Sequence, residues 1–290
     1  NITNKVKIKF VLTAWSGPDQ ECITSSTTIT IEVTNAIIFT EYITEDMTLT
    51  NDREWIFQNS MVISNGATLT INAGTIIRMS SQAKIIVCPT CSIISNGTAE
   101  DRVTITGVSG PGLTDAYTYW GGVIIEYNGD TYGELESSDG TIIANYGNNT
   151  EVLNSLDDVP NSIAFQRAKF FYTNFEYVRG VGISGVLYNG GFLAQNCKFL
   201  FQKMSEFGGF MNPGGATIYL DRSIIKYSTF STYSSLTSLD GGAGAIHRNT
   251  NWIYNSHTWG LWGSSNPPSY APFYIDDKYL SDNYAPPFYN

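Results

Sequence analysis

The chain has 290 residues, of which 42% are hydrophobic, 13% aromatic and only 14% charged, with a formal net charge of −10. This composition supports a large packed core and excludes an intrinsically disordered chain. The acidic balance disfavours nucleic acids and anionic membranes as partners, and the sequence has no apolar run of about 18 residues that would insert into a bilayer.

Residues 1–36 contain two alternating stretches, VKIKFVLTAW and STTITIEV, separated by the turn-rich SGPDQEC. Such a pattern predicts a β-hairpin, and this one resembles the last two strands of an immunoglobulin-like sandwich. Two strands alone do not make a stable domain. We therefore expect the hairpin either to cap the segment that follows or to belong to a domain completed upstream. The chain starts inside a strand and shows no signal peptide, so we expect a mature or excised piece of a longer protein.

Residues 37–262 carry a repeat. The stretch VISNGATLTINAGTIIRM alternates apolar and polar residues, and the shift that places Val62 on Ile85 also places Gly74 on Gly97. Self-similarity at a period of about 20 to 30 residues in strand-rich sequence is typical of a solenoid.

A looser repeat follows, in which an asparagine or arginine opens an aromatic strand. Its members are Asn174, Asn196, Arg222 and Asn251, and the intervals between them lengthen along the chain. Glycine clusters such as GVGISG and DGGAGA lie between these strands and suit corners that need positive φ. The best helical candidate, EVLNSLDDV near Glu151, predicts a short turn of helix at most.

These patterns predict an all-β protein whose main domain is a right-handed parallel β-helix. At about 24 residues per rung, residues 61–255 would form about eight rungs. Residues 263–290 hold five prolines within the last 24 positions, together with many tyrosines. We expect this Pro/Tyr-rich segment to be an extended tail.

The four cysteines include the CPTC pair, Cys88 and Cys91. A structural zinc site needs four ligands, and a redox pair favours a helix N-terminus, whereas CPTC lies between two predicted strands. We interpret the pair as a small disulfide that closes a turn, in agreement with an oxidising, extracellular location. The pairing of Cys22 and Cys197 stays open.

Several segments follow one another in an order that carries a resemblance: ITEDMTLTNDREWIFQNSMVISNGATLTINAGTIIRM, AKIIV, IISNGTAEDRVTITG and YWGGVII. Together they resemble the secreted right-handed β-helix surface proteins of Bacteroidota-type bacteria, with rungs of the forms GATLTI-x-x-GT and WGG-x-x-I. The resemblance covers about residues 37–126. It implies export and a cell-surface or released location, and a structural or adhesive role rather than one particular activity.

An enzyme is the main alternative, because parallel β-helices also host polysaccharide lyases and glycoside hydrolases. A hydrolase needs two carboxylates at a defined spacing, and the available pairs lie in expected loops or in the tail: Asp157 with Asp158, Asp276 with Asp277, and Glu134 with Glu136. We interpret them as solvated charges.

A lyase needs a base and a group that neutralises a uronate carboxylate. The candidates are scattered along the chain: Arg167, Lys169, Arg179, Lys198, His247 and His257. We therefore assign no catalytic residue, no metal site and no cofactor, although loop Asp and Asn side chains could hold Ca²⁺.

Aromatic residues near the end of the repeat give the best indication of a binding site. Solvent-facing aromatic rings stack on sugar rings, and the candidates are Trp252, Trp259, Trp262 and Tyr270. The favoured alternative is that they cap the open end of the coil, while Tyr119 and Trp120 belong to the core of the WGG rung. The sequence leaves the choice between a cap and a site open.

Taken together, the sequence predicts a non-catalytic extracellular scaffold or adhesin segment. Its expected partners are other protein segments or subunits of a surface assembly, with glycans as a second class. A carbohydrate-binding module and a polysaccharide lyase or glycoside hydrolase of the β-helix type are the alternatives.

Overall fold

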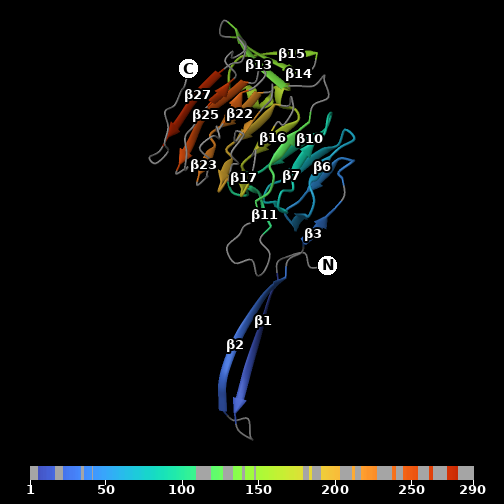
Figure 1. Cartoon of the computed structure of the whole chain (residues 1–290), viewed down its shortest axis with the longest axis vertical. Coiled ribbons are helices and arrows are strands. Elements are labelled where there is room, and N and C mark those ends of the chain that lie inside the picture. The colour runs from blue at the N-terminus through green and yellow to red at the C-terminus, as the bar shows by residue number, and fades with distance from the viewer. Residues whose placement is uncertain are drawn as a thin grey trace.

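A computed structural model describes residues 6–16, 22–33, 36–40, 42–108, 119–126, 133–138, 141–146, 148–178, 183–184, 191–202, 211–212, 217–226, 237–239, 244–253, 261–263 and 273–279. Figure 1 shows a body of stacked strands, with the N-terminal strands extending away from it. No helix in this described part of the chain is long and apolar enough to cross a membrane.

The N-terminal strands form the expected hairpin. β1 (Val6–Ser16) and β2 (Cys22–Val33) pair antiparallel, from Val6 opposite Val33 to Ser16 opposite Cys22, with an irregularity next to Trp15. Figure 1 shows the pair standing apart from the stacked strands rather than covering them. The likeness to the end of an immunoglobulin-like sandwich stays a prediction.

The body is a parallel solenoid with three faces, called here the coil. The first face consists of β4 (Met47–Leu49), β7 (Thr68–Asn72), β10 (Ser92–Asn96), β16 (Ala168–Phe171), β19 (Phe192–Gln195), β22 (Thr217–Asp221) and the start of β25 (Gly244–Ile253). The second face consists of β3 (Ala36–Phe39), β5 (Glu54–Phe57), β8 (Ile76–Met79), β11 (Val103–Gly107), β17 (Thr173–Glu176), β20 (Lys198–Leu200), β23 (Ile224–Lys226) and the end of β25. The third face consists of β6 (Met61–Ile63), β9 (Ile85–Val87), β12 (Val123–Ile125), β18 (Ile183–Ser184), β21 (Met211–Asn212), β24 (Thr237–Leu239) and β26 (Leu261–Gly263).

Each strand pairs in parallel with the strand one turn further along the chain. The strands from β4 to β21 make about five turns, and β22 to β26 continue the same pairings. β27 (Phe273–Tyr279) then adds to β25. The expected all-β parallel solenoid is therefore confirmed, whereas the expected number of about eight rungs is not.

The register differs from the first sequence repeat by a single position. Val62 pairs with Ile86, not Ile85, and Asn72 pairs with Asn96. Because side chains alternate between faces, a slip of this size would exchange inside and outside. Ile85 is fully buried, whereas Ile86 is half-buried on the outer surface.

The shift that places Gly74 on Gly97 is one residue shorter than the shift between the paired strands. These glycines lie in the corners after the paired strands, where connections differ in length from turn to turn. Asn72 and Asn96 are partners, so the first corner reaches its glycine one position later than the second. A glycine match therefore does not report strand register.

The second repeat needs a correction at two of its positions. Asn174 pairs with Lys198, Lys198 with Ile224, and Ile224 with Asn251, so Asn174 and Asn251 occupy one row of strands. Asn196 and Arg222 precede this row. They lie at the corner between the first and second faces. The residues at this corner in successive turns share a positive φ: Tyr172 (46°), Asn196 (56°), Arg222 (48°) and Asn249 (50°).

The interior changes character along the coil. Early turns fill it with Ile, Leu, Val and Met, including Leu69 and Ile77. Later turns fill it with phenylalanines whose rings contact one another, such as Phe170 and Phe192 at 5.2 Å between centroids. Trp120 is fully buried, as expected for the WGG rung, and its indole Nε1 donates to the Glu176 carbonyl oxygen at 2.8 Å.

A segment between β12 and β16 covers part of the first face. It forms the three antiparallel strands β13 (Gly133–Ser138), β14 (Thr141–Tyr146) and β15 (Asn149–Leu153), followed by the short 3-10 helices η1 (Val159–Asn161) and η2 (Ile163–Phe165). Its apolar residues, Phe165 among them, pack on Leu193 and Tyr219, which would otherwise face solvent. The sequence did not predict this small sheet: Glu151 lies in β15 rather than in a helical turn.

Candidate functional site

The outer surface of the third face carries a row of uncharged residues. Ile43 makes a parallel bridge with Ile63 at the start of this face, so Tyr42 lies beside Val62 on the outside. Val62 pairs with Ile86, and Ile86 with Ile124. All three aliphatic residues are half-buried, whereas their strand neighbours face the core.

The register extends this row to the far end of the coil. Ile124 pairs with Ser184, Ser184 with Asn212, and Ser238 with Trp262. The Met211 to Thr237 pairing places Asn212 next to Ser238. We call this set of register positions the outer row, after the exposed or half-buried residues at its first four positions: Tyr42, Val62, Ile86, Ile124, Ser184, Asn212, Ser238 and Trp262.

The strand register separates residues that the sequence had grouped as a possible aromatic site. Trp262 occupies the last position of the outer row. Trp252 pairs with Ile225, and Ile225 with Phe199, so its position belongs to a row of core residues on the second face. Trp259 and Tyr270 lie outside the described residues. The register thus places the two described tryptophans on different faces of the coil, Trp252 on the second and Trp262 on the third.

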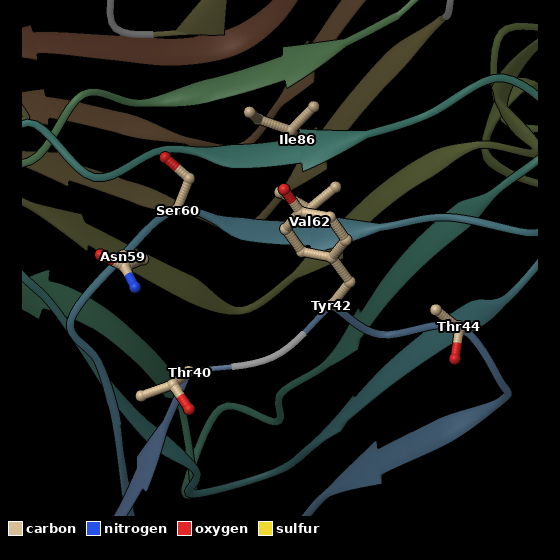
Figure 2. Close-up of a pocket in the computed structure, with 7 residues that line it drawn as sticks. All are labelled: Thr40, Tyr42, Thr44, Asn59, Ser60, Val62 and Ile86. Atoms are coloured by element: carbon tan, nitrogen blue, oxygen red, sulfur yellow. The ribbon is translucent and has the colours of Figure 1, made fainter.

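A hollow of about 750 Å³ lies at the first end of the outer row, and Figure 2 shows the residues that line it. They are Thr40, Tyr42, Thr44, Asn59, Ser60, Val62 and Ile86. The Tyr42 side chain is 67% exposed, and its ring lies by β6, whose Val62 forms the floor with Ile86. None of the seven lining residues is ionisable except the tyrosine.

Hydrogen bonds hold the walls of the hollow in place. The backbone N–H groups of Ile43 and Ser64 donate to the carbonyl oxygens of Val62 at 2.8 Å and Ile43 at 2.9 Å, respectively. The Ser60 Oγ accepts from the Lys84 backbone N–H at 3.0 Å. The hollow is therefore built on the regular edge of the coil.

The sequence did not single out Tyr42. The alternation of the stretch EYIT, with one buried isoleucine between two exposed residues, is the available signal. It does not reveal that Asn59, Ser60 and Ile86, from two other turns, complete the hollow.

Charged side chains on the other faces join neighbouring parts of the fold. Arg78 donates to both carboxylate oxygens of Glu54, at 2.9 and 3.3 Å, linking β8 to β5. Arg248 in β25 forms an ion pair with Asp157 of the covering segment at 2.7 Å.

The carboxylate of Asp221 is buried in the first face. Its Oδ2 accepts from the Gln195 Nε2 at 2.9 Å and pairs with Arg222 at 2.7 Å, while its Oδ1 has no hydrogen-bond partner among the described residues. Gln195 lies in the neighbouring strand, so this contact also joins two turns.

Arg167 is the most enclosed of the described residues considered for a lyase. It is 1% exposed and its guanidinium donates to the carbonyl oxygens of Val87, Cys88, Cys91 and Glu126 at 2.6–3.3 Å. Burial lowers the pKa of Arg167. These bonds all go to the backbone, so Arg167 holds corners of the coil together.

The other lyase candidates are spread over different strands. Lys169 lies on β16, where burial lowers its pKa and Glu151 opposes the shift. Lys198 lies on β20 and His247 on β25, while Arg179 and His257 lie outside the described residues.

The three candidate hydrolase pairs lie on different parts of the fold. Asp157 pairs with Arg248, and the Asp158 Oδ2 accepts from the backbone N–H groups of Asn154 and Ser155. Glu134 and Glu136 lie on β13, and Asp276 and Asp277 on β27. In the described part of the chain no group of three His, Cys, Asp or Glu residues is arranged to hold a metal ion.

Cys88 and Cys91 are both free thiols in the structure, as is Cys197. Cys88 and Cys91 close a turn in which the Cys91 backbone N–H donates to the Cys88 carbonyl oxygen at 3.1 Å. Desolvation and a hydrogen bond with Glu126 raise the pKa of Cys88 to about 11. The disulfide expected from the sequence stays a prediction.

Comparison with known proteins supports the coil alone. Residues 41–157 match the family described as pectate-lyase like beta helix domain. This pectate-lyase-like β-helix match covers the first turns and most of the covering segment. No curated protein and no solved structure gave a significant match.

Proposed function

We propose that the chain is a non-catalytic scaffold or adhesin segment of an extracellular, cell-surface protein. The observation that carries this proposal is the use of charged side chains as cross-links. Glu54 with Arg78 joins two turns, Asp157 with Arg248 joins the covering segment to the coil, and Arg167 joins several corners. Carboxylates held by arginines in this way link neighbouring parts of the stack of strands, which is a structural use of charge.

The coil is taken to be right-handed, because crossover connections between parallel strands have this hand in about 98% of cases. Its partners would be other segments or subunits of a surface assembly, which could meet its long faces and its ends. The low charge content and the many Thr, Ser and Asn residues fit an exported β-solenoid.

The pectate-lyase-like match raises polysaccharide cleavage as the competing function. The test is incubation of the protein with pectin, polygalacturonate and neutral polysaccharides, with and without Ca²⁺. New reducing ends report hydrolysis, and absorbance of unsaturated uronates reports elimination. We expect neither product to form; sustained product formation that depends on the protein would overturn the non-catalytic proposal.

A further inference from the structure

We propose that the outer row of the third face binds a neutral oligosaccharide chain, with the hollow around Tyr42 as its anchoring subsite. This inference rests on the proposed adhesin function and names the chemical class of its ligand. The hollow lies at the first turns of the coil, far along the chain from Trp259 and Tyr270, which the sequence indicated as candidate ligand-binding residues.

The saccharide would stack on the exposed ring of Tyr42. Tyr42 is 67% exposed beside the aliphatic floor of Val62 and Ile86. A sugar ring has apolar C–H faces that stack on an aromatic ring, while its hydroxyl groups remain at the edge. Stacking there would remove both the tyrosine ring and part of the aliphatic floor from water.

Polar side chains also line the hollow. Thr40, Thr44 and Asn59 place two hydroxyl groups and one amide around the ring (Figure 2). Among the described residues, none of these three side chains has a hydrogen-bond partner. Hydroxyl and amide groups both donate and accept, which matches the mixed donor and acceptor character of sugar hydroxyls.

The lining of the hollow contains no Lys, Arg, Asp or Glu. Carboxylates and phosphates are recognised through charge-assisted bonds to cations, and the net charge of −10 repels polyanions. The hollow therefore favours a neutral saccharide over a uronate or a phosphorylated glycan.

The outer row runs in a direction that suits an extended ligand. Parallel strands lie about 4.8 Å apart, so its eight positions extend over roughly 34 Å along the coil. Every position of the row is uncharged, and aromatic residues occur at both ends, Tyr42 and Trp262. An extended chain of sugar rings running across the strands would meet one position of the row at each strand.

The test is isothermal titration with cellohexaose, xylohexaose and mannohexaose, using hexagalacturonate as the acidic comparison. We expect at least one neutral probe to bind, with about a tenfold weaker affinity for Tyr42→Ala, since stacking is lost. Tyr42→Phe keeps the ring and should bind within about twofold of the parent chain. Asn59→Ala removes a rim group and should weaken binding without abolishing it.

Ile38→Ala is the matched control, because Ile38 is 56% exposed on the second face and does not line the hollow. Circular dichroism of each variant separates loss of binding from loss of fold. The inference is overturned if no neutral probe binds, if hexagalacturonate binds more tightly, or if Tyr42→Ala and Ile38→Ala behave alike. The same samples are assayed for cleavage products: cleavage would refute the non-catalytic proposal, whereas absent binding without cleavage would refute only the saccharide site.

Discussion

The rings of Phe175 and Phe199 stack with their centroids 4.9 Å apart and their planes 3° from parallel. The two residues are partners in the pairing of β17 with β20, one turn apart. Each is 1% exposed. Identical side chains in consecutive turns thus interlock along the coil axis, and the core behaves as a stack of layers.

We expect Phe175→Ala to lower the free energy of unfolding by about 3–5 kcal/mol, because it removes a buried ring and leaves a cavity between layers. Chemical denaturation measures the change. Val152→Ala, at a site 64% exposed on β15, is the control and should change stability by less than about 0.5 kcal/mol. Equal effects of the two substitutions would contradict a core role for the Phe175 ring.

Arg167→Met should destabilise the coil by about 3–5 kcal/mol, because the carbonyl oxygens of four residues lose a buried cationic donor. Arg167→Lys should recover part of this loss, since one ammonium group cannot reach all four oxygens. Urea denaturation of both variants provides the measurement.

Arg53→Met serves as the control for Arg167, because Arg53 pairs with Asp52 at the surface. It should leave stability nearly unchanged. If Arg167→Met resembled this surface variant, the bonds of Arg167 to the corners would not contribute to folding.

The Cys197 thiol predicts a dependence of stability on pH. Burial raises its pKa from 9.0 to about 12. The native thiol therefore stays neutral while the unfolded thiol ionises, so its contribution is complete below pH 9 and is lost as pH rises toward 12. Between these values the parent chain should lose about 1.4 kcal/mol per pH unit more than Cys197→Ala.

Denaturation at several pH values between about 8 and about 11 isolates this contribution. Lysine and tyrosine titration is common to both proteins and cancels in the difference. Parallel stability curves would show that Cys197 is not kept neutral in the folded chain.

Gly97 and Gly66 should respond differently to alanine. A Cβ at Gly97 would lie 2.5 Å from the Tyr172 carbonyl oxygen, whereas one at Gly66 meets nothing within 4 Å but adopts a φ of +74°. We expect Gly97→Ala to cost about 2–3 kcal/mol and Gly66→Ala about 1 kcal/mol. Thermal unfolding compares them, and the reverse order would indicate that the corner at Gly97 relaxes easily.

The CPTC disulfide is tested by intact mass under oxidising conditions. A turn closed by a hydrogen bond brings the two Cα atoms within about 7 Å, close to the range that a disulfide spans. We expect the mass to fall by that of two hydrogen atoms relative to the reduced chain, with no alkylation of Cys88 or Cys91. Rapid labelling of both thiols would refute the pairing, and Cys197 serves as the internal buried reference.

Much of the coil could be predicted from short patterns. Alternation in VISNGATLTINAGTIIRM identifies strands. Its recurrence identifies a parallel stack, because each strand of such a stack buries one side in the interior of the coil. Register could not be read in the same way. Gly74 and Gly97 lie in corners of different length. Asn174 and Asn196 are both asparagines, but the first belongs to a strand and the second to a corner.

By itself, the sequence determined the all-β class, the repeat and the burial of Trp120, since these depend on residues close together in the chain. Tertiary structure decided which residues share a surface. Tyr42, Asn59 and Ile86 come from three successive passes of the chain, and Trp262 joins their row through register alone. The physical reason is that parallel pairing fixes neighbours across turns, whereas local sequence fixes only which side of a strand a residue occupies.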